Sequence, residues 1–241
     1  MLIKMEKPVV LSKAVDIISD LVTDVRIKFN EFGLSIVAID PANVAMIGFR
    51  IPKSAFSQFE AGEEVIGINL DSLKRILKRC GAGSSLIMEK KENLLHIQIH
   101  DRIKRNFTLS LIDIEAEEKE IPELEYSSKV EISSVDLIDG VDDCAVIGDA
   151  CSFVIEEGKF VIEAKGLNSA RAEFSGDEAK IEAENCKSRY SLEYMQKFMK
   201  GAKLCDKTIL QFANDHPLRI DFNGDHSNLV FILAPRVETD D

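Results

Sequence analysis

The segment DSLKRILKR, residues 71–79, has the residue spacing of an amphipathic helix. Its apolar residues share one side of the predicted helix and are Leu70, Leu73, Ile76 and Leu77. Its basic residues fill a neighbouring side and are Lys74, Arg75, Lys78 and Arg79. A face that only meets solvent usually mixes lysine with glutamate, and this face does not. At this point the basic face fits either a solvated surface or a site for an anionic partner.

The apolar spacing of this helix recurs later in the chain. Residues 191–203, SLEYMQKFMKGAK, repeat it 122 residues further on. Three more pairs of segments recur at nearly the same spacing: VVLSKAVDIISDLV (9–22) with SSVDLIDGVDDCAV (133–146), GLSIVAI (33–39) with GKFVIEA (158–164), and NLLHIQIHD (93–101) with HPLRIDFNG (216–224). In the first of these pairs Val15 matches Ile138. A nearly constant offset predicts two similar domains of roughly 115 residues, each with two helices and many strands.

The predicted strands alternate apolar and polar residues. In NFTLSLID, residues 106–113, the side chains of Phe107, Leu109 and Leu111 point one way. Such half-buried strands suit antiparallel sheets covered on one face by helices. The predicted class is therefore α+β, with an N-terminal domain over residues 1–114 and a C-terminal domain over residues 129–241.

A charged segment separates the two predicted domains. Residues 115–128 contain Pro122 and show no helical stripe, so they predict an extended linker. Ile121, Leu124 and Tyr126 are more apolar than a purely solvated linker needs.

The acidic composition does not by itself exclude a nucleic-acid partner. The chain has 30 Lys and Arg against 42 Asp and Glu, a net charge of -12. Residues 1–114 hold 16 basic and 14 acidic side chains, whereas residues 115–241 hold 14 and 28. Phosphate repels an acidic protein unless its basic residues gather on one surface. The distribution of charge, and not its total, decides this point.

Targeting and cysteine signals predict an intracellular protein. No stretch approaches the ~18 apolar residues of a membrane span, and we expect neither a signal peptide nor a membrane partner. The five cysteines are scattered and include no C-x-x-C pair, which indicates free thiols and no zinc site.

The sequence offers little for catalysis. His96 and His100 lie four residues apart on one strand, about 13 Å from each other, and cannot share a metal ion. We expect both to face solvent. GAGS, residues 81–84, follows a predicted helix and therefore indicates a helix end and a turn, not a phosphate-binding loop. We expect no enzymatic activity, no cofactor and no metal.

Several motifs resemble one family over nearly the whole chain. GLSIVAIDPANVAMIGFRIPKSAF, NLDSLKRILKR, EIPELEYS and the terminal FILAPRVE resemble, in the same order, the sliding clamps of DNA replication of the proliferating cell nuclear antigen type. The resemblance implies a ring of three such chains, with helices around a central hole, sheets outside and duplex DNA threaded through it. It also implies partners that bind through short glutamine and aromatic motifs, namely DNA polymerase, the clamp loader, flap endonuclease and DNA ligase.

The resemblance places three sets of residues. DNA-facing residues would be Lys13, Lys74, Arg75, Lys78, Arg79, Lys197, Lys200 and Lys203, the last three on one helical stripe. A partner-peptide pocket would comprise Ile39, Val44, Ile121, Pro122, Leu124, Pro217, Leu233, Ala234 and Pro235. The subunit interface would join NFTLSLID to NSARAEFSG of the next copy and comprise Arg79, Arg105, Phe107, Leu109, Leu111, Asp139, Asp142, Asp143, Ala170, Ala172 and Phe174.

The third predicted helix departs from what a DNA-facing helix needs. It carries Asp136, Asp139, Asp142 and Asp143 and no basic residue. We expect the last three aspartates to pair with Arg79 and Arg105 of the neighbouring subunit. Glu193 and Asn43 also stand where relatives often have a basic residue and a histidine, respectively. Two alternatives remain: a subunit of a heterotrimeric or checkpoint clamp, and a two-domain interaction scaffold that never encircles DNA.

Overall fold

A computed structural model describes residues 1–115 and 119–237 of the chain. It forms two compact units. The first unit comprises Met1–Pro41, Ile47–Ile121 and Gly224–Leu229, and the second comprises Ala42–Met46, Pro122–Asn223 and Val230–Asp241. Residues 116–118 of the predicted linker lie outside the described residues, and residues 119–127 form neither helix nor strand.

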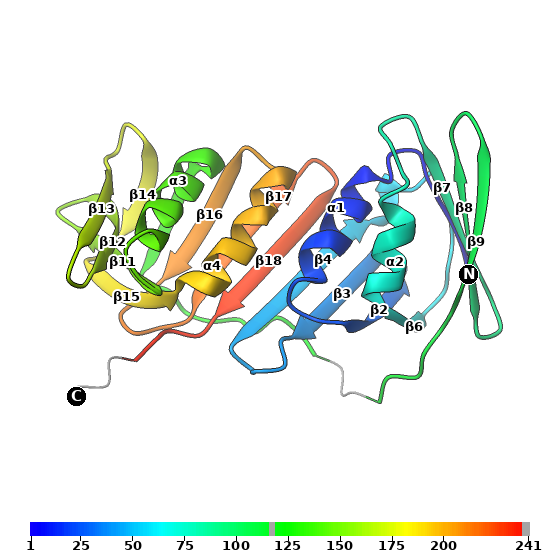
Figure 1. Ribbon diagram of the computed structural model, residues 1–241, viewed down its shortest axis with the longest axis horizontal. Coiled ribbons are helices and arrows are strands. Elements are labelled where there is room, and N and C mark those ends of the chain that lie inside the picture. The colour runs from blue at the N-terminus through cyan, green and yellow to red at the C-terminus, as the bar shows by residue number, and fades with distance from the viewer. Residues whose placement is uncertain (116–118, 238–241) are drawn as a thin grey trace. The chain divides into compact units, whose positions relative to one another are not determined.

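The first unit is built from strands and two α-helices (Figure 1). Its elements are β1 (Leu2–Met5), α1 (Val9–Ile18), β2 (Asp24–Asn30), β3 (Gly33–Ile39), β4 (Ala45–Pro52), β5 (Gln58–Glu60), β6 (Glu64–Asn69), α2 (Leu70–Leu77), β7 (Ser85–Lys91), β8 (Leu94–His100) and β9 (Lys104–Ser110), with the short 3-10 helix η1 (Lys53–Ala55). The strands lie side by side in the orders β5-β1-β7-β8-β9 and β4-β3-β2-β6. Each strand pairing with a described register is antiparallel.

The second unit has the same order of strands and α-helices, although its 3-10 helix lies at a different place. Its elements are β10 (Ser128–Ser133), α3 (Ser134–Ala145), β11 (Ala150–Glu156), β12 (Lys159–Lys165), β13 (Ser169–Phe174), β14 (Ala179–Ala183), β15 (Cys186–Ser191), α4 (Leu192–Met199), η2 (Lys200–Leu204), β16 (Lys207–Phe212), β17 (Leu218–Gly224) and β18 (Ser227–Leu233). The strand orders β14-β10-β16-β17-β18 and β13-β12-β11-β15 repeat those of the first unit strand for strand. The prediction of two similar α+β domains is confirmed.

The buried positions show why the sequence repeats. The buried residues of α2 are Leu70, Leu73, Ile76 and Leu77, and those of α4 are Leu192, Met195, Phe198 and Met199, each 122 residues later. In β8 and β17 the buried residues Leu95, Ile97 and Ile99 match Leu218, Ile220 and Phe222 in the same way, 123 residues apart. Ile138 is an exception, because it is only half-buried on α3 whereas Val15 is fully buried on α1. The repeat thus preserves the positions that pack into each core.

The helices lie in pairs. Helix α1 contacts α2, and α3 contacts α4 (Figure 1). Helix α2 begins after Asn69, whose side-chain oxygen accepts a hydrogen bond from the backbone N–H of Ser72 at 3.0 Å. After α2, the backbone N–H of Gly81 donates to the Ser84 hydroxyl at 2.9 Å, so GAGS forms the predicted turn.

The predicted histidine positions were wrong in one respect. His96 and His100 lie on one face of β8 as predicted, but both are half-buried and not solvent-facing. They pair across the sheet with Thr108 and Lys104 of β9 and with Glu89 and Ser85 of β7, and His96 Nδ1 lies 3.3 Å from the Thr108 hydroxyl. The described residues contain no group of His, Cys, Asp and Glu that could hold a metal ion. All five cysteines are free, and no described helix is long and apolar enough to cross a membrane.

Candidate functional site

A carboxylate joins the two helices of the first unit. Asp16 on α1 lies with its Oδ1 3.0 Å from Lys74 Nζ and 3.1 Å from Lys78 Nζ. Lys74 Nζ also donates to the hydroxyl of Ser19 at 2.9 Å, and that hydroxyl donates to the backbone oxygen of Asp16. Burial raises the pKa of Asp16, but hydrogen bonds from Lys74 and Lys78 outweigh it and hold the pKa below its usual value. We call Asp16, Lys74 and Lys78 the two-lysine bridge.

The arginines beside this bridge differ from its lysines. Arg75 and Arg79 are exposed, and within the described part of the chain neither forms an ion pair. Helix α2 ends at Leu77, so Lys78 is its C-cap and Arg79 lies beyond it. Basic groups at a helix C-terminus also interact favourably with the helix dipole. The predicted basic face therefore exists, with two of its four cations held by one aspartate.

The helix pair of the second unit carries a different charge pattern. Lys197 Nζ lies 2.8 Å from Glu193, one turn earlier on α4, and 5.3 Å from the ring centre of Tyr194. Gln196 Nε2 lies 3.5 Å from Asp142 Oδ1 on α3. The carboxylates of Asp139, Asp142 and Asp143 are exposed, whereas Asp136 is half-buried. The acidic character predicted for the third helix is therefore a property of its surface.

One part of the predicted lysine stripe was wrong. Helix α4 ends at Met199, and Lys200 and Lys203 lie in the 3-10 helix η2. Gly201 is buried against the ring of Phe222, where a Cβ atom would lie 2.6 Å from the ring carbons. This close approach accompanies the tighter turn that replaces the predicted α-helical stripe.

The two edge strands β9 and β13 hold most of the apolar residues that were predicted for the subunit interface. Within the described residues β9 pairs only with β8, and β13 pairs only with β12. Phe107 and Leu109 on β9 are half-buried and alternate with exposed residues, as predicted. On β13 Ala170 and Ala172 are half-buried and Phe174 is buried, whereas Leu111 lies just beyond the end of β9. Unpaired edges of this kind are templates for pairing with another chain.

Arg105 on β9 has a partner in its own chain. Its Nη1 lies 2.7 Å from Asp101 Oδ2. A hydrogen bond from the backbone N–H of Ile103, followed by that from Arg105, lowers the pKa of Asp101. The predicted pairing of Arg105 with a neighbouring subunit would therefore have to share its guanidinium with Asp101.

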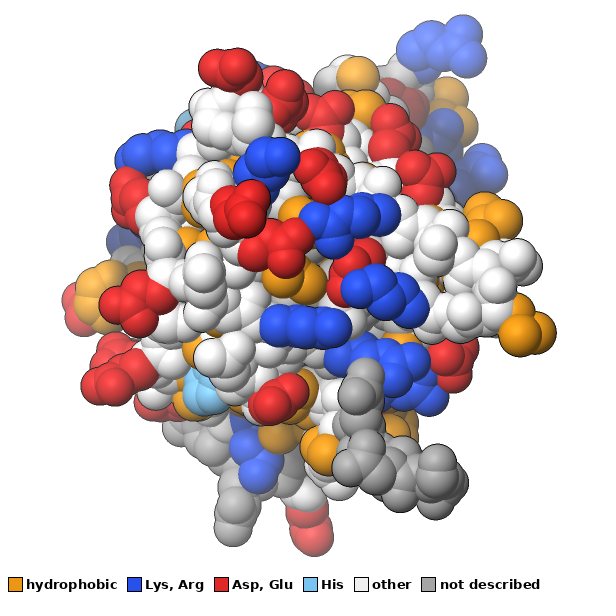
Figure 2. Space-filling view, turned by 90° about the vertical axis from the view of Figure 1, so that its left-hand side faces the viewer, with side chains coloured by type: hydrophobic (Ala, Val, Ile, Leu, Met, Phe, Trp, Pro, Cys, Tyr) orange, Lys and Arg blue, Asp and Glu red, His pale blue; other side chains and the backbone are white. Residues whose placement is uncertain are grey.

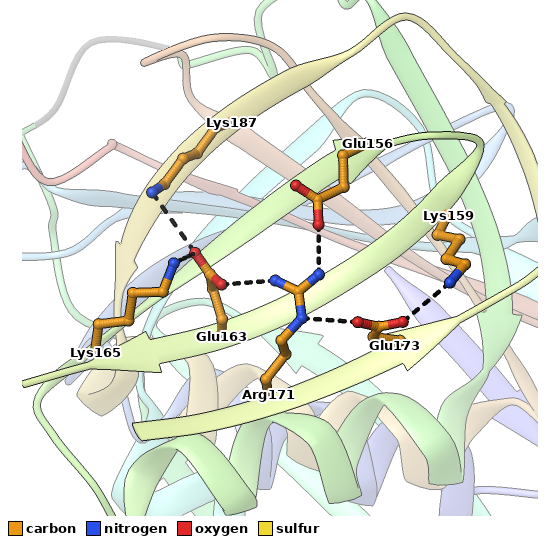
Figure 3. A network of polar contacts seen from close by, with 7 residues as sticks. All are labelled: Glu156, Lys159, Glu163, Lys165, Arg171, Glu173 and Lys187. Atoms are coloured by element: carbon orange, nitrogen blue, oxygen red, sulfur yellow. Dashed lines mark hydrogen bonds and ion pairs between the residues drawn. The ribbon is translucent and has the colours of Figure 1, made fainter. Parts of the chain in front are cut away.

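A charged network covers the outer side of the β13-β12-β11-β15 sheet (Figure 3). Arg171 Nη1 lies 2.9 Å from Glu163, its Nε lies 2.8 Å from Glu173, and its Nη2 contacts Glu156. Lys165 and Lys187 reach Glu163 at 2.8 and 3.6 Å. Burial raises the pKa of Glu163, but these cations outweigh it and lower the pKa overall. Sequence reasoning missed this network, although alternating charges along β12 and β13 are visible in the sequence.

The surface of this end of the second unit is mixed in charge. Figure 2 shows acidic and basic side chains interspersed over it, with several basic side chains close together from the centre toward the right of the view. The residues predicted to face DNA lie elsewhere, on and beside α1, α2 and α4.

The residues of the predicted partner pocket belong to both units. Ile39 and Ile121 lie in the first unit, and the other seven lie in the second. In the first unit Ile121 packs on Gly48, where a Cβ atom would lie 2.8 Å from Ile121 Cγ1. In the second unit the backbone N–H of Ala234 donates to the carbonyl of Val44 at 2.9 Å.

A ring contact between Tyr126 and His216, close in sequence to the predicted pocket residues, was not foreseen from the sequence. The ring of Tyr126 meets that of His216 edge-on, with centres 5.5 Å apart. The Tyr126 hydroxyl and His216 Nε2 are both buried atoms without a hydrogen-bond partner among the described residues. Burial raises the pKa of Tyr126 to about 12. Tyr126 was singled out as too apolar for a linker, but nothing in the sequence pairs it with His216.

Comparisons with known proteins agree with this architecture. Residues 1–120 match the family described as proliferating cell nuclear antigen, N-terminal domain, and residues 120–237 match the C-terminal domain of the same family. The chain is 39% identical to DNA polymerase sliding clamp 1 of Thermococcus kodakarensis over 228 residues, covering 91% of this chain and 92% of that protein. It is 35% identical to the DNA polymerase sliding clamp of Pyrococcus furiosus over 236 residues, or 94% of each chain.

Solved structures share the fold. The proliferating cellular nuclear antigen of Entamoeba histolytica superposes with a TM-score of 0.91 at 24% identity, covering 98% of both chains. A chain of the PCNA2–PCNA3 complex of Sulfolobus tokodaii superposes with a TM-score of 0.89 at 27% identity, covering 99% of this chain and 100% of that one. The matched domains, the relatives and the repeated fold together place this chain in the proliferating cell nuclear antigen family.

Proposed function

We propose that the protein is a DNA sliding clamp, which encircles duplex DNA and tethers the replicative polymerase to its template. The observation that carries this proposal is the similarity to DNA polymerase sliding clamps over more than nine-tenths of both chains. A clamp acts by threading and tethering and makes or breaks no covalent bond, so it is not an enzyme.

The DNA contacts follow from the needs of a sliding protein. A ring that slides must attract phosphate without reading bases, since a base-specific contact would stop it. The predicted DNA-facing residues on and beside α1, α2 and α4 have flexible basic side chains suited to this task. Within this set the exposed Arg75 and Arg79 are the strongest candidates, because no carboxylate of the described chain holds them.

Ring closure would use the two strand edges. We propose that three copies assemble by pairing β9 of one copy with β13 of the next, which removes both unpaired edges. Asp139, Asp142 and Asp143 would approach Arg79 and Arg105 of the neighbouring copy. Exposed ion pairs contribute only about 0–1 kcal/mol each, so these pairs would adjust the interface and not create it.

Assembly is tested by the mass of the protein purified alone. A trimer supports the homotrimeric ring, and a monomer at micromolar concentration would point to a ring that needs other chains. Arg79→Ala should make the trimer dissociate at lower salt. An Arg79→Ala trimer with unchanged stability and salt response would remove Arg79 from the interface.

Partner proteins would dock on the apolar residues in and near the linker. We propose that polymerase, clamp loader, flap endonuclease and DNA ligase insert a short motif of glutamine and aromatic residues against Ile121, Leu124 and the other predicted pocket residues. Ile121→Asp should weaken such a peptide at least tenfold, because a carboxylate would enter an apolar contact. Titration of a labelled peptide measures this, with the exposed Glu120→Asp as a matched control. Equal affinity for wild type and Ile121→Asp would contradict the placement.

Polymerase extension tests the function itself. On primed circular DNA with clamp loader, the protein should lengthen the products made in a single binding event. A two-domain interaction scaffold predicts no stimulation and no salt-dependent retention on DNA.

A further inference from the structure

In the two-lysine bridge, the carboxylate of Asp16 contacts the same two ammonium groups that a DNA phosphate would have to contact. Asp16 Oδ1 lies about equally far from two ammonium groups, 3.0 Å from Lys74 and 3.1 Å from Lys78. The Lys78 side chain is 57% exposed and that of Asp16 is 36% exposed, so the bridge lies at the surface and a ligand can reach it. Ser19 accepts a further hydrogen bond from Lys74 and fixes the ammonium group beside the carboxylate.

We propose that Asp16 is an internal competitor of DNA, a residue that weakens the hold of α2 on the phosphate backbone and so keeps the clamp mobile. This inference rests on the proposed DNA-facing role of α2. A carboxylate and a phosphate diester each offer one negative charge and oxygen acceptors to an ammonium group. Lys74 and Lys78 can therefore neutralise a phosphate only by leaving Asp16 or by sharing their charge with it.

The competition suits a protein that must bind and slide at once. Lysines that pair fully with phosphate release counterions and bind tightly, which makes every step along the duplex more costly. Because Asp16 is within reach, each lysine can exchange its ion pair between the Asp16 carboxylate and a DNA phosphate, which attract it to a similar degree. The bridge is therefore expected to lower affinity and to raise the rate of diffusion along DNA.

The second unit lacks one of the two lysines of this bridge, although Asp139 and Lys200 match Asp16 and Lys78 in the sequence. At the position that matches Lys74, 122 residues later, α4 carries Gln196, which contacts Asp142. A neutral amide has no positive charge, so a carboxylate and a phosphate do not compete for it as they would for an ammonium group. The two-lysine bridge is thus a feature of the first unit. Substitutions in it should change DNA binding by the first unit and leave the contribution of the second unit unchanged.

The test compares Asp16→Asn with Asp71→Asn in the full chain. Both substitutions remove one negative charge near α2, but Asp71 is exposed in the first turn and has no lysine partner among the described residues. Binding to a fluorescent linear duplex is measured by anisotropy over a series of salt concentrations. Asp16→Asn should bind about five- to tenfold more tightly at low salt, the range expected for releasing two exposed ion pairs. Asp71→Asn should change affinity less than twofold.

Two further readouts separate competition from a general charge effect. Asp16→Asn should steepen the salt dependence, because each further phosphate neutralised adds about 0.9 to the slope of log K against log salt. Diffusion of the ring along stretched DNA should slow. Adding Lys74→Gln and Lys78→Gln to Asp16→Asn should abolish the gain. Asp16→Ser serves as a second neutral variant if the thermal midpoint of Asp16→Asn falls.

The outcomes decide the proposal. Equal affinity of Asp16→Asn and Asp71→Asn, or weaker binding by Asp16→Asn, would overturn it, the latter by showing that Asp16 orients the lysines toward DNA. Wild-type protein tests the proposed function separately. If wild type neither binds duplex in a salt-dependent way nor stimulates polymerase, the clamp function itself fails; if wild type does both, a failure of Asp16→Asn concerns the competition alone.

Discussion

The helix pair α1–α2 and the helix pair α3–α4 occupy matching places in two copies of one fold, yet their exposed residues differ in charge. Lys13 and Asp16 on α1 match Asp136 and Asp139 on α3, and Lys74 on α2 matches Gln196 on α4. The buried residues of α2 and α4 agree position by position, and those of α1 and α3 agree except where the buried Val15 matches the half-buried Ile138. Packing constrains a buried position in both copies, whereas an exposed position is free to serve a different purpose in each.

This comparison suggests a division of labour between the two units. The first unit offers more basic side chains to a ligand, and Asp16 restrains two of them. The second unit offers fewer, and its exposed aspartates on α3, which we propose to face arginines of a neighbouring subunit, would repel DNA. The following predictions test the comparison, beginning with the largest expected effect.

The buried faces should differ in how much they contribute to stability. Phe198 is fully buried and stacks on Phe231 with ring centres 4.2 Å apart, and its counterpart Ile76 is slightly accessible. Phe198→Ala should reduce the free energy of unfolding by about 3–5 kcal/mol, and Ile76→Ala by about 2–4 kcal/mol. Urea unfolding followed by circular dichroism measures both. A larger loss for Ile76→Ala would mean that the core around α2 is the tighter of the two.

The exposed cations should differ in their contribution to DNA binding. Replacing Arg75 by alanine should weaken binding to duplex at low salt by about fivefold, since an exposed charge with no carboxylate partner among the described residues is lost. Lys197→Ala should weaken it only about twofold, because Glu193 already holds that lysine. Anisotropy titrations give both values. The difference between the units would be contradicted if Lys197→Ala had the larger effect.

The pH dependence of the bridge gives the smallest effect. The folded-state pKa of Asp16 is lowered, so its ion pairs stabilise the fold above the ordinary aspartate pKa of about 4 and are lost as pH falls through the lower folded-state value. Asp16→Asn should therefore reduce the free energy of unfolding by less than about 1 kcal/mol at pH 7, given its exposure. The difference from wild type should shrink as the pH falls below the ordinary aspartate pKa and through the lower folded-state value. A difference that grows on acidification would contradict this sign.

Much of the architecture could be predicted from the sequence. The constant offset between repeats depends on buried residues, whose spacing is set by helix and strand periodicity and is therefore visible in one dimension. The two-domain α+β fold, the turn at residues 81–84 and the alternating burial of β9 all followed from such spacing. The acidic face of α3 followed in the same way, whereas the roles assigned to the site residues stay predictions.

What the sequence alone could not decide was which polar groups meet. Asp16 and Lys74 are 58 residues apart, and only the packing of α1 on α2 brings their charges to 3.0 Å. Tyr126 meets His216, and Arg171 gathers three carboxylates, for the same reason. The close approach of Gly201 to the ring of Phe222, just after the end of α4, likewise joins residues that are distant in the sequence. Burial leaves a periodic mark in the sequence, but contacts between side chains from distant segments are set by tertiary packing and leave none.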